Sequence, residues 1–256
     1  MGRQIVFLHI PKTAGQAVRD MLLRSFPKKL ACPAMGDYQI AVYSKEELNQ
    51  FEIFAGHYSP SLMDALRDDA FVFTVLRDPG HRIISFHRFI REQARAMSPE
   101  ALSWPQNAGP AAALRMPFDQ FLATQDPNLR TYVRNSLDNF YTYYFGTRRF
   151  GARYMIRDIY PDSDYFITEK VLHNAIANIA SGIHVYYMDK FDELIRDLSA
   201  MDGYQESPLL KINAGAALEG KIRDYCQANS DSLDRTLEYL YIFTQWDWRI
   251  FNYFKP

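Results

Sequence analysis

The chain has 256 residues, of which 48% are hydrophobic and 15% aromatic. A chain of this length buries roughly 70–75% of its unfolded surface, so its core needs no disulfide or metal, and one domain over the whole chain, residues 1–256, is the default expectation. The formal net charge of −1, with acidic and basic residues well mixed, argues against a general binder of nucleic acid or of membrane surfaces. Any anion site must therefore be local.

Neither the cysteines nor the apolar runs indicate a secreted or membrane-spanning chain. Cys32 and Cys226 are far apart and fit no metal-ligand pattern, so reduced cytosolic thiols are the simpler interpretation, with one disulfide as the open alternative. No stretch approaches about 18 consecutive apolar residues, and the apolar run at residues 5–10 is too short for the core of a signal peptide. We therefore expect no membrane span and no metal cluster.

The first predicted unit is a strand, a tight loop and a helix. The apolar run at residues 5–10 is typical of a buried parallel strand; it breaks at Pro11, and a helical pattern covers residues 16–26. The first N–H groups of a helix have no partners within it, and the helix dipole adds positive potential, so the loop at residues 12–15 is a candidate anion site. Lys12 brings a full positive charge to the same place.

This loop differs from the nucleotide-binding pattern GxxxxGK[ST], because its lysine precedes the glycine and the loop is shorter. A phosphate-type anion is still the expected ligand. The alternative is an ordinary strand-to-helix connection that carries a surface lysine.

Two further predicted strands also end in polar residues. Residues 52–55 form a brief strand that His57 follows, and residues 70–76 form a strongly apolar strand that runs into Arg77. A proline next to Arg77 suits the first turn of the helix predicted over residues 80–96. Residues 44–47 have the pattern of a capping box for a short helix between the first two strands.

The rest of the chain alternates helices with one more strand. Residues 98–117 contain several prolines and small residues and are predicted to be a loop. Further helices are predicted over residues 118–122, 129–145, 164–180 and 191–198, a strand over residues 183–188, and two helices with an aromatic tail over residues 216–254. Strands that alternate with helices imply a three-layer α/β fold with a central parallel sheet flanked by helices.

Three polar elements follow the predicted strands. They are the loop at residues 12–15, His57, and Arg77 with Ser85 on the next helix. Because ligands of an open α/β sheet bind beyond the carboxyl ends of its strands, these residues can converge on one site.

At these positions the chain resembles the carbohydrate sulfotransferases. HIPKTAG at residues 9–15 is similar to their 5′-phosphosulfate loop, and the pattern RDPxxRxxS at residues 77–85 resembles their 3′-phosphate motif. GHYS at residues 56–59 resembles the segment that holds the acceptor-activating histidine in heparan sulfate 2-O-sulfotransferase and its relatives. Residues 138–146 and 186–198 resemble two later segments of the family, so the order of motifs matches over most of the chain.

The resemblance implies a P-loop-like fold and a nucleotide donor, 3′-phosphoadenosine 5′-phosphosulfate (PAPS), with 3′-phosphoadenosine 5′-phosphate (PAP) as product. It makes His57 the base that takes the acceptor proton, a role suited to a side chain whose ordinary pKa is about 6.5. Lys12 and the loop N–H groups stabilise the leaving phosphate, and Arg77 with Ser85 binds the 3′-phosphate. No metal is required, because the sulfate is already activated. The implied nucleotide-binding residues are Pro11, Lys12, Thr13, Ala14, Gly15, Gln16, Ala17, Arg77, Ser85 and, in a late loop that closes over the nucleotide, Lys211 and Asn213.

Two positions depart from the family pattern. Gln16 and Ala17 stand where the family commonly has Thr-Ser, so two hydroxyl contacts to the 5′-phosphate are missing or replaced; backbone N–H groups and the Gln16 amide are candidates to replace them. Tyr143 stands where the family commonly has an arginine, which bears on the acceptor.

The sequence thus predicts a sulfotransferase that acts on a saccharide hydroxyl. Transfer to a lipid or small natural product, a P-loop kinase and a non-catalytic nucleotide-binding protein are the alternatives. The missing GK[ST] and the lack of a clear strand-end aspartate for magnesium disfavour the kinase. Eukaryotic relatives begin with a membrane anchor, whereas the first strand here begins almost at Met1, so a bacterial-type cytoplasmic enzyme is expected.

Several residues near the motifs have a plainer expected role. We expect His9 to be packed within the first strand and Arg82 to brace the motif that contains it. The aromatic residues between positions 140 and 145 are candidates to stack on a sugar, but aromatic residues at helical spacing more often belong to a core.

Overall fold

The computed structural model describes residues 2–150, 164–206, 218–229 and 231–255. The chain divides into two compact units, which are described separately. The sheet unit contains Met1–Arg77, Tyr141–Ala214 and Tyr253–Pro256, and the helical unit contains Asp78–Phe140 and Gly215–Asn252. That residues 1–256 act as one domain stays a prediction.

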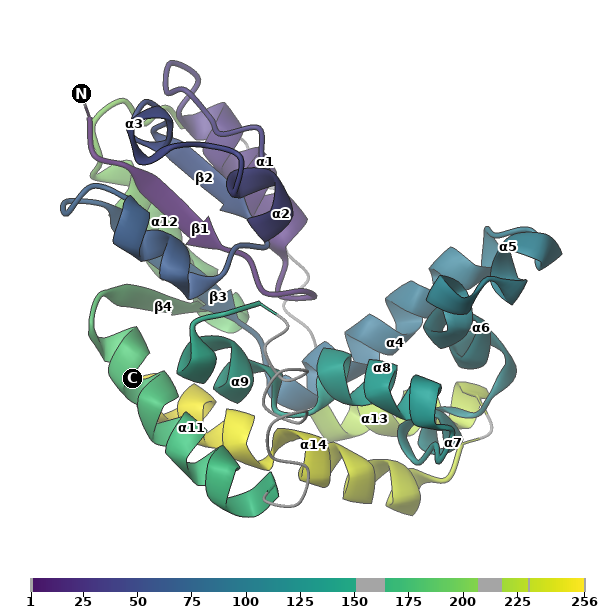
Figure 1. Ribbon diagram of the computed structural model, residues 1–256. Coiled ribbons are helices and arrows are strands. Elements are labelled where there is room, and N and C mark those ends of the chain that lie inside the picture. Colours follow the sequence, from purple (N-terminus) through teal and green to yellow (C-terminus); the bar gives the residue numbers. More distant parts are fainter. Residues whose placement is uncertain (1, 151–163, 207–217, 230, 256) are drawn as a thin grey trace. The chain divides into compact units, whose positions relative to one another are not determined.

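The sheet unit is built on four parallel strands in the order β2-β1-β3-β4 (Figure 1). The strands are β1 (Ile5–Leu8), β2 (Ile53–Gly56), β3 (Phe71–Leu76) and β4 (Ile183–Tyr187). The residues of β1, β2 and β3 are buried throughout, as is typical of parallel strands that are covered on both faces. The predicted α/β fold with a central parallel sheet is confirmed.

One face of the sheet packs on helices α1 (Gly15–Ser25) and α12 (Phe191–Ser199). Alternate strand residues such as Phe7 and Phe73 meet Leu22 of α1 and Leu194 of α12 in one apolar cluster. This packing fixes the direction in which the chain leaves β1 and enters α1. The other elements of the unit are α2 (Asp37–Ile40), α3 (Lys45–Leu48), the 3-10 helices η1 (Pro60–Ala65) and η3 (Met188–Lys190), α9 (Phe140–Thr147), which starts in the helical unit, and α11 (Asp164–Ala180). The predicted capping box at the start of α3 is present.

The helical unit has its own apolar core, to which helix α4 (Pro79–Arg95) contributes Ile83, Ile84 and Ile90. Arg82 of this helix is fully buried and donates to the carbonyl oxygens of Ser136 and Leu137 at 3.2 and 3.1 Å, so it holds the end of α8 (Pro127–Leu137). The elements are α4 (Pro79–Arg95), α5 (Pro99–Ser103), η2 (Pro105–Asn107), α6 (Ala108–Arg115), α7 (Phe118–Leu122), α8 (Pro127–Leu137), α13 (Leu218–Asn229) and most of α14 (Leu233–Phe254).

Two sequence predictions were wrong here. The expected loop at residues 98–117 contains α5, η2 and α6, because prolines at the first helical positions start α5 and η2 and the Ser98 side chain caps α5. The single helix expected over residues 129–145 is split into α8 and α9. Asn139, between them, has a φ of 46°, and its N–H donates to the carbonyl oxygen of Phe243 at 2.7 Å.

Three further findings concern membrane spans, metal ligands and thiols in the part of the chain that the structure describes. No helix among them is long and apolar enough to cross a membrane. No group of three or more metal-ligating side chains occurs within the described ranges. Cys32 and Cys226 are buried, free thiols.

Candidate active site

The loop after β1 has an unusual backbone. Lys12 and Ala14 have φ angles of 73° and 65°, a left-handed conformation that costs a non-glycine residue about 1–2 kcal/mol. The buried Thr13 hydroxyl donates to the carbonyl oxygen of Ile10 at 2.9 Å and holds the turn together. Thr13 therefore stabilises the loop through its side chain. Strain of this kind persists where the surrounding structure holds it, and such positions concentrate at ligand sites.

Helix α1 starts at this loop without a side-chain cap. Its N-cap is Ala14, which has no polar side chain, and its first turn contains no acidic residue. The first N–H groups of α1 can therefore receive an external anion. The Gln16 amide donates to Asp20 Oδ1 at 2.9 Å, so one of its two N–H donors is already engaged within the helix.

Gly15 is required by its contact with His9. A Cβ atom at position 15 would overlap the His9 imidazole, which lies directly against the backbone of the loop. His9 is packed, as expected, and its ring stacks on Phe7 with the centroids 5.4 Å apart. Burial, followed by the charges of His57 and Lys12, lowers the pKa of His9 to about 3. His9 is therefore neutral at physiological pH.

His57 lies immediately beyond the carboxyl end of β2, in the register that pairs Gly56 with Leu8. Its Nδ1 is 2.8 Å from the carbonyl oxygen of His9, and its ring stacks on the His9 ring with the centroids 4.2 Å apart. Because a carbonyl oxygen only accepts hydrogen bonds, this contact requires the proton on Nδ1. The Nε2 lone pair of neutral His57 is therefore the proton-accepting position.

The electrostatic environment keeps His57 in the neutral form. Burial lowers its pKa below the ordinary 6.5, and the hydrogen bond to His9 opposes that shift in part. At neutral pH the imidazole is accordingly a base. On another side of the ring lies Phe150, with the centroids 5.5 Å apart.

The segment that carries His57 is held on several sides. The N–H of His57 donates to the carbonyl oxygen of Met35 at 2.8 Å, and Asp37 accepts hydrogen bonds from the N–H and the hydroxyl of Ser59. Tyr144, fully buried in α9, donates to the carbonyl oxygen of Tyr58 at 2.6 Å. These contacts fix the backbone on both sides of the imidazole.

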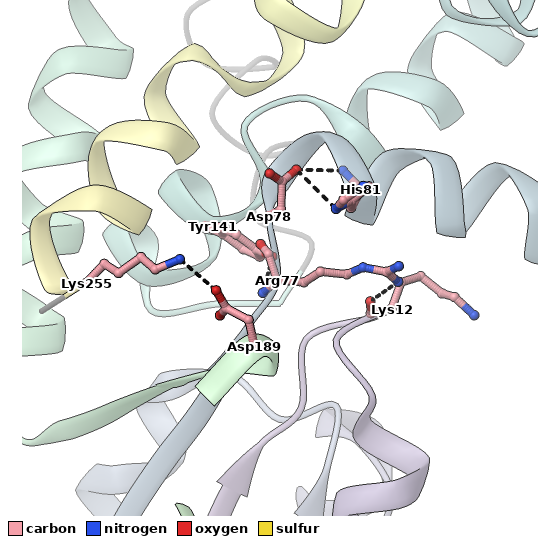
Figure 2. A network of polar contacts seen from close by, with 7 residues as sticks. All are labelled: Lys12, Arg77, Asp78, His81, Tyr141, Asp189 and Lys255. Atoms are coloured by element: carbon pink, nitrogen blue, oxygen red, sulfur yellow. Dashed lines mark hydrogen bonds and ion pairs between the residues drawn. The ribbon is translucent and has the colours of Figure 1, made fainter. Parts of the chain in front are cut away.

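Arg77 follows β3 and reaches the loop after β1 (Figure 2). Its Nη1 donates to the carbonyl oxygen of Lys12 at 3.3 Å. The hydroxyl of the buried Tyr141 accepts from the N–H of Arg77 at 3.2 Å and donates to its carbonyl oxygen at 2.7 Å. Burial, and then the Arg77 charge, lowers the pKa of Lys12. Two cationic side chains are thus gathered beside the start of α1.

Two aspartates that follow strands accept hydrogen bonds from nearby groups. Asp78, the N-cap of α4, accepts from the N–H of His81 at 2.9 Å. Asp189, just after β4, accepts from Lys255 Nζ at 2.8 Å (Figure 2). Both are strand-end aspartates that the sequence analysis did not single out.

Three predicted nucleotide-binding residues do not lie among the described residues of the sheet unit. Ser85 is half-buried on α4 of the helical unit. Lys211 and Asn213 lie outside the described residues. In α9, Phe140, Tyr141, Tyr143, Tyr144 and Phe145 are buried, so these rings form core rather than an open face for a sugar.

Four residues that surround the predicted site had no assigned role in the sequence analysis, or only a packing one. They are His9, Asp37, Tyr141 and Tyr144, which hold His57 or Arg77. The motif at residues 9–15 could have indicated that His9 lies near the site. The contact between His9 and His57, however, depends on the pairing of β1 with β2. The tyrosines lie in a segment that resembles the family, without a mark that distinguishes them from core residues.

Within the sheet unit, the loop, Arg77 and the two histidines therefore follow three neighbouring strands. The arrangement offers uncapped N–H groups and cations for an anion, together with a neutral imidazole that can accept a proton. It is suited to a reaction in which a hydroxyl is deprotonated and an anionic group leaves.

The comparisons with known proteins agree with this chemistry. No curated protein matches the chain significantly. A profile of the sulfotransferase family matches residues 2–143, more than half of the chain, and this range includes the loop after β1, His57 and Arg77. The chain belongs to the sulfotransferase family.

Proposed function

We propose that this sulfotransferase moves a sulfonate group from PAPS to a hydroxyl of a saccharide, with His57 as the general base. The observation that carries the proposal is the contact between His57 Nδ1 and the His9 carbonyl oxygen, which leaves Nε2 to accept a proton at the edge of the sheet where the anion loop lies. A neutral imidazole after β2, together with cations and helix N–H groups after the neighbouring strands, fits the separate needs of the acceptor and the leaving group.

In this proposal the donor binds through its phosphates. Lys12 and the N–H groups at the start of α1 hold the 5′-phosphate, along the backbone of residues 11–17. Arg77 binds the 3′-phosphate through its guanidinium, whose planar set of donors suits a phosphate. Ser85, Lys211 and Asn213 are proposed as further nucleotide contacts on the strength of the resemblance.

The reaction then proceeds by direct transfer. His57 Nε2 takes the proton of the acceptor hydroxyl as the hydroxyl oxygen forms a bond to sulfur. The bond between sulfur and the bridging phosphate oxygen breaks, and that oxygen leaves with the electron pair as part of PAP. Lys12 and the N–H groups of α1 stabilise the charge that develops on it, which is electrostatic stabilisation by groups already in position.

A saccharide is the proposed acceptor because residues 56–59 resemble the corresponding segment of heparan sulfate 2-O-sulfotransferase. A lipid or small natural-product hydroxyl is the alternative acceptor. We also propose that residues 1–256 act as one catalytic domain and that the enzyme is cytoplasmic, a location that suits two buried free thiols.

The proposal is tested by sulfonate transfer from radiolabelled PAPS to a panel of saccharides, with lipid and small-molecule alcohols in parallel. We expect His57→Ala to lower kcat by about 10²–10⁴-fold and to bind PAP like the wild type. The matched control is His173→Ala, which removes an exposed histidine from α11 and should leave the rate unchanged. Full activity of His57→Ala would contradict the proposal, and transfer of phosphate from ATP with magnesium would replace it by a kinase function.

A further inference from the structure

We propose that His9 is a positioning residue that couples the anion loop to the base His57. This inference rests on the proposed function, because it assigns His9 a task in the deprotonation that His57 performs. His9 does not touch the reacting atoms in this account. It acts by holding His57 in one tautomer and one orientation while its other side rests on the loop that receives the phosphate.

The first contact is between His9 and His57. The carbonyl oxygen of His9 lies 2.8 Å from His57 Nδ1, and the rings stack at 4.2 Å with an interplanar angle of 24°. The backbone of His9 therefore selects the tautomer of His57, and the ring of His9 limits its tilt. His9 and His57 directly follow the paired ends of the neighbouring parallel strands β1 and β2, so the register of these strands brings them together.

The second contact is between His9 and the anion loop. The His9 imidazole occupies the space that any side chain at position 15 would need, because Gly15 brings the first turn of α1 against the ring. The His9 ring also stacks on Phe7, which in turn stacks on Phe73 with the centroids 5.1 Å apart. The His9 ring therefore packs against a row of buried aromatic side chains, which limits its movement towards the sheet.

His9 therefore contacts both the anion loop and the base His57. A shift of the first turn of α1 on phosphate binding must act on the His9 ring, and a shift of that ring must act on His57. The charged and titratable groups that face His9 are His57 and Lys12, and both disfavour a second positive charge there. His9 accordingly stays neutral, and its ring acts through packing rather than through charge.

The choice of residue at position 9 follows from that packing. A five-membered ring fills the gap between the loop backbone and His57, whereas alanine would leave the gap open. Phenylalanine keeps a flat ring in the stack without the two nitrogen atoms. Comparison of the two substitutions therefore separates the loss of the ring from the loss of its polar atoms.

The test combines kinetics, nucleotide binding and NMR on the full chain. In His9→Ala we expect kcat to fall by about 10–100-fold, because a base displaced by a fraction of an ångström to about 1 Å loses alignment. We expect PAP affinity to stay near that of the wild type. We also expect the acid limb of the kcat/KM profile to move to higher pH, towards 6.5, because the exposed His57 ring is more easily protonated. His9→Phe should restore most of kcat and the wild-type acid limb.

Several outcomes would overturn the inference. A wild-type rate and pH profile in His9→Ala would show that the ring does not position His57. An equal loss of rate and PAP affinity in both variants, with an unshifted acid limb, would show that His9 only stabilises the loop.

A nitrogen NMR measurement of the wild type keeps the inference testable even if His9→Ala does not fold. It should find the His57 proton on Nδ1, and a proton on Nε2 in the neutral ring would reject the contact with His9. Failure of the proposed function gives a different result, because the wild type would then transfer no sulfonate while the NMR experiment could still detect the His57 tautomer.

Discussion

Helices α1 and α4 each begin just after a buried parallel strand, but their N-termini are occupied differently. The N-cap of α4 is Asp78, whose carboxylate accepts a hydrogen bond from the His81 N–H. The N-cap of α1 is Ala14, which provides no acceptor and has a left-handed backbone. At α4 the carboxylate of the chain itself accepts a hydrogen bond from the helix start. At α1 no side chain caps the helix start.

The difference explains how two similar strand-loop-helix units can have separate tasks. At α1 the N–H groups themselves are available to a phosphate, and Lys12 adds charge. At α4 the Asp78 carboxylate already accepts one of the first N–H groups, so in the proposed donor site the Arg77 side chain, rather than the helix start, is the phosphate ligand in this part of the sequence. The capped start of α4 is expected to contribute stability, whereas the uncapped start of α1 is the proposed binding site.

The largest effect on PAP affinity is expected when the start of α1 receives an aspartate like the one at the start of α4. We expect Ala14→Asp to lower PAP affinity by about 100-fold, because its carboxylate would repel the phosphate at close range. Aspartate tolerates a left-handed backbone, so the fold should be kept, with thermal stability unchanged or increased. Calorimetric titration with PAP measures the effect.

The matched control is Ala14→Asn, which has a similar size and the same tolerance of positive φ but no charge. We expect it to bind PAP much better than Ala14→Asp does. Equal affinities in the two variants would show that charge at the start of α1 has no part in binding.

A second substitution tests the close packing on the α1 side. Gly15→Ala forces the His9 ring away from the loop, and we expect turnover to fall by about 10–100-fold and stability to fall by roughly 1–3 kcal/mol. The control is Gly220→Ala in α13, where a Cβ meets nothing within 4 Å, so a small gain in stability is expected. Unfolding in urea and the transfer assay measure both variants, and a silent Gly15→Ala would contradict the described contact.

The pH dependence separates turnover from anion binding. In the proposed mechanism deprotonated His57 is the active form. Because burial lowers its pKa below 6.5, kcat/KM should be level at neutral pH and fall about tenfold per unit below that pKa. The acid limb should disappear from the residual rate of His57→Ala. A rate that rises as the pH falls below 6.5 would mean that a protonated group is required instead.

The smallest expected effect is on the α4 side. Asp78→Ala removes the cap and should lower the free energy of unfolding by about 1 kcal/mol. Asp78→Asn keeps an acceptor for the His81 N–H and should restore most of that stability. If Asp78→Ala were as stable as the wild type, the cap would not stabilise α4.

Much of the fold was predictable because its signals are local. The four strands were found as short apolar runs, and Arg77 and His57 were placed by the ends of those runs. The helices between positions 98 and 117 were missed because prolines there start helices rather than interrupt them. The break at Asn139 was missed because its conformation depends on contacts with α14, far away in the sequence.

The candidate site was predictable in its parts and not in its connections. The motifs named Lys12, His57 and Arg77, but the contact between His9 and His57 joins residues 48 positions apart and depends on the register of β1 and β2. Similarly, nothing local in the sequence indicates that Tyr141 holds the backbone of Arg77, or that Thr13 turns its hydroxyl inward.

We propose that the loop after β1 and Arg77 bind the nucleotide of a sulfonate donor. Calorimetric titration of the full chain with PAP, beside ATP with magnesium and an Arg77→Ala variant, tests it most directly. We expect the wild type to bind PAP more tightly than ATP and the Arg77→Ala variant to lose most of the affinity for PAP. Preference for ATP with magnesium, or PAP binding that Arg77→Ala retains in full, would contradict it.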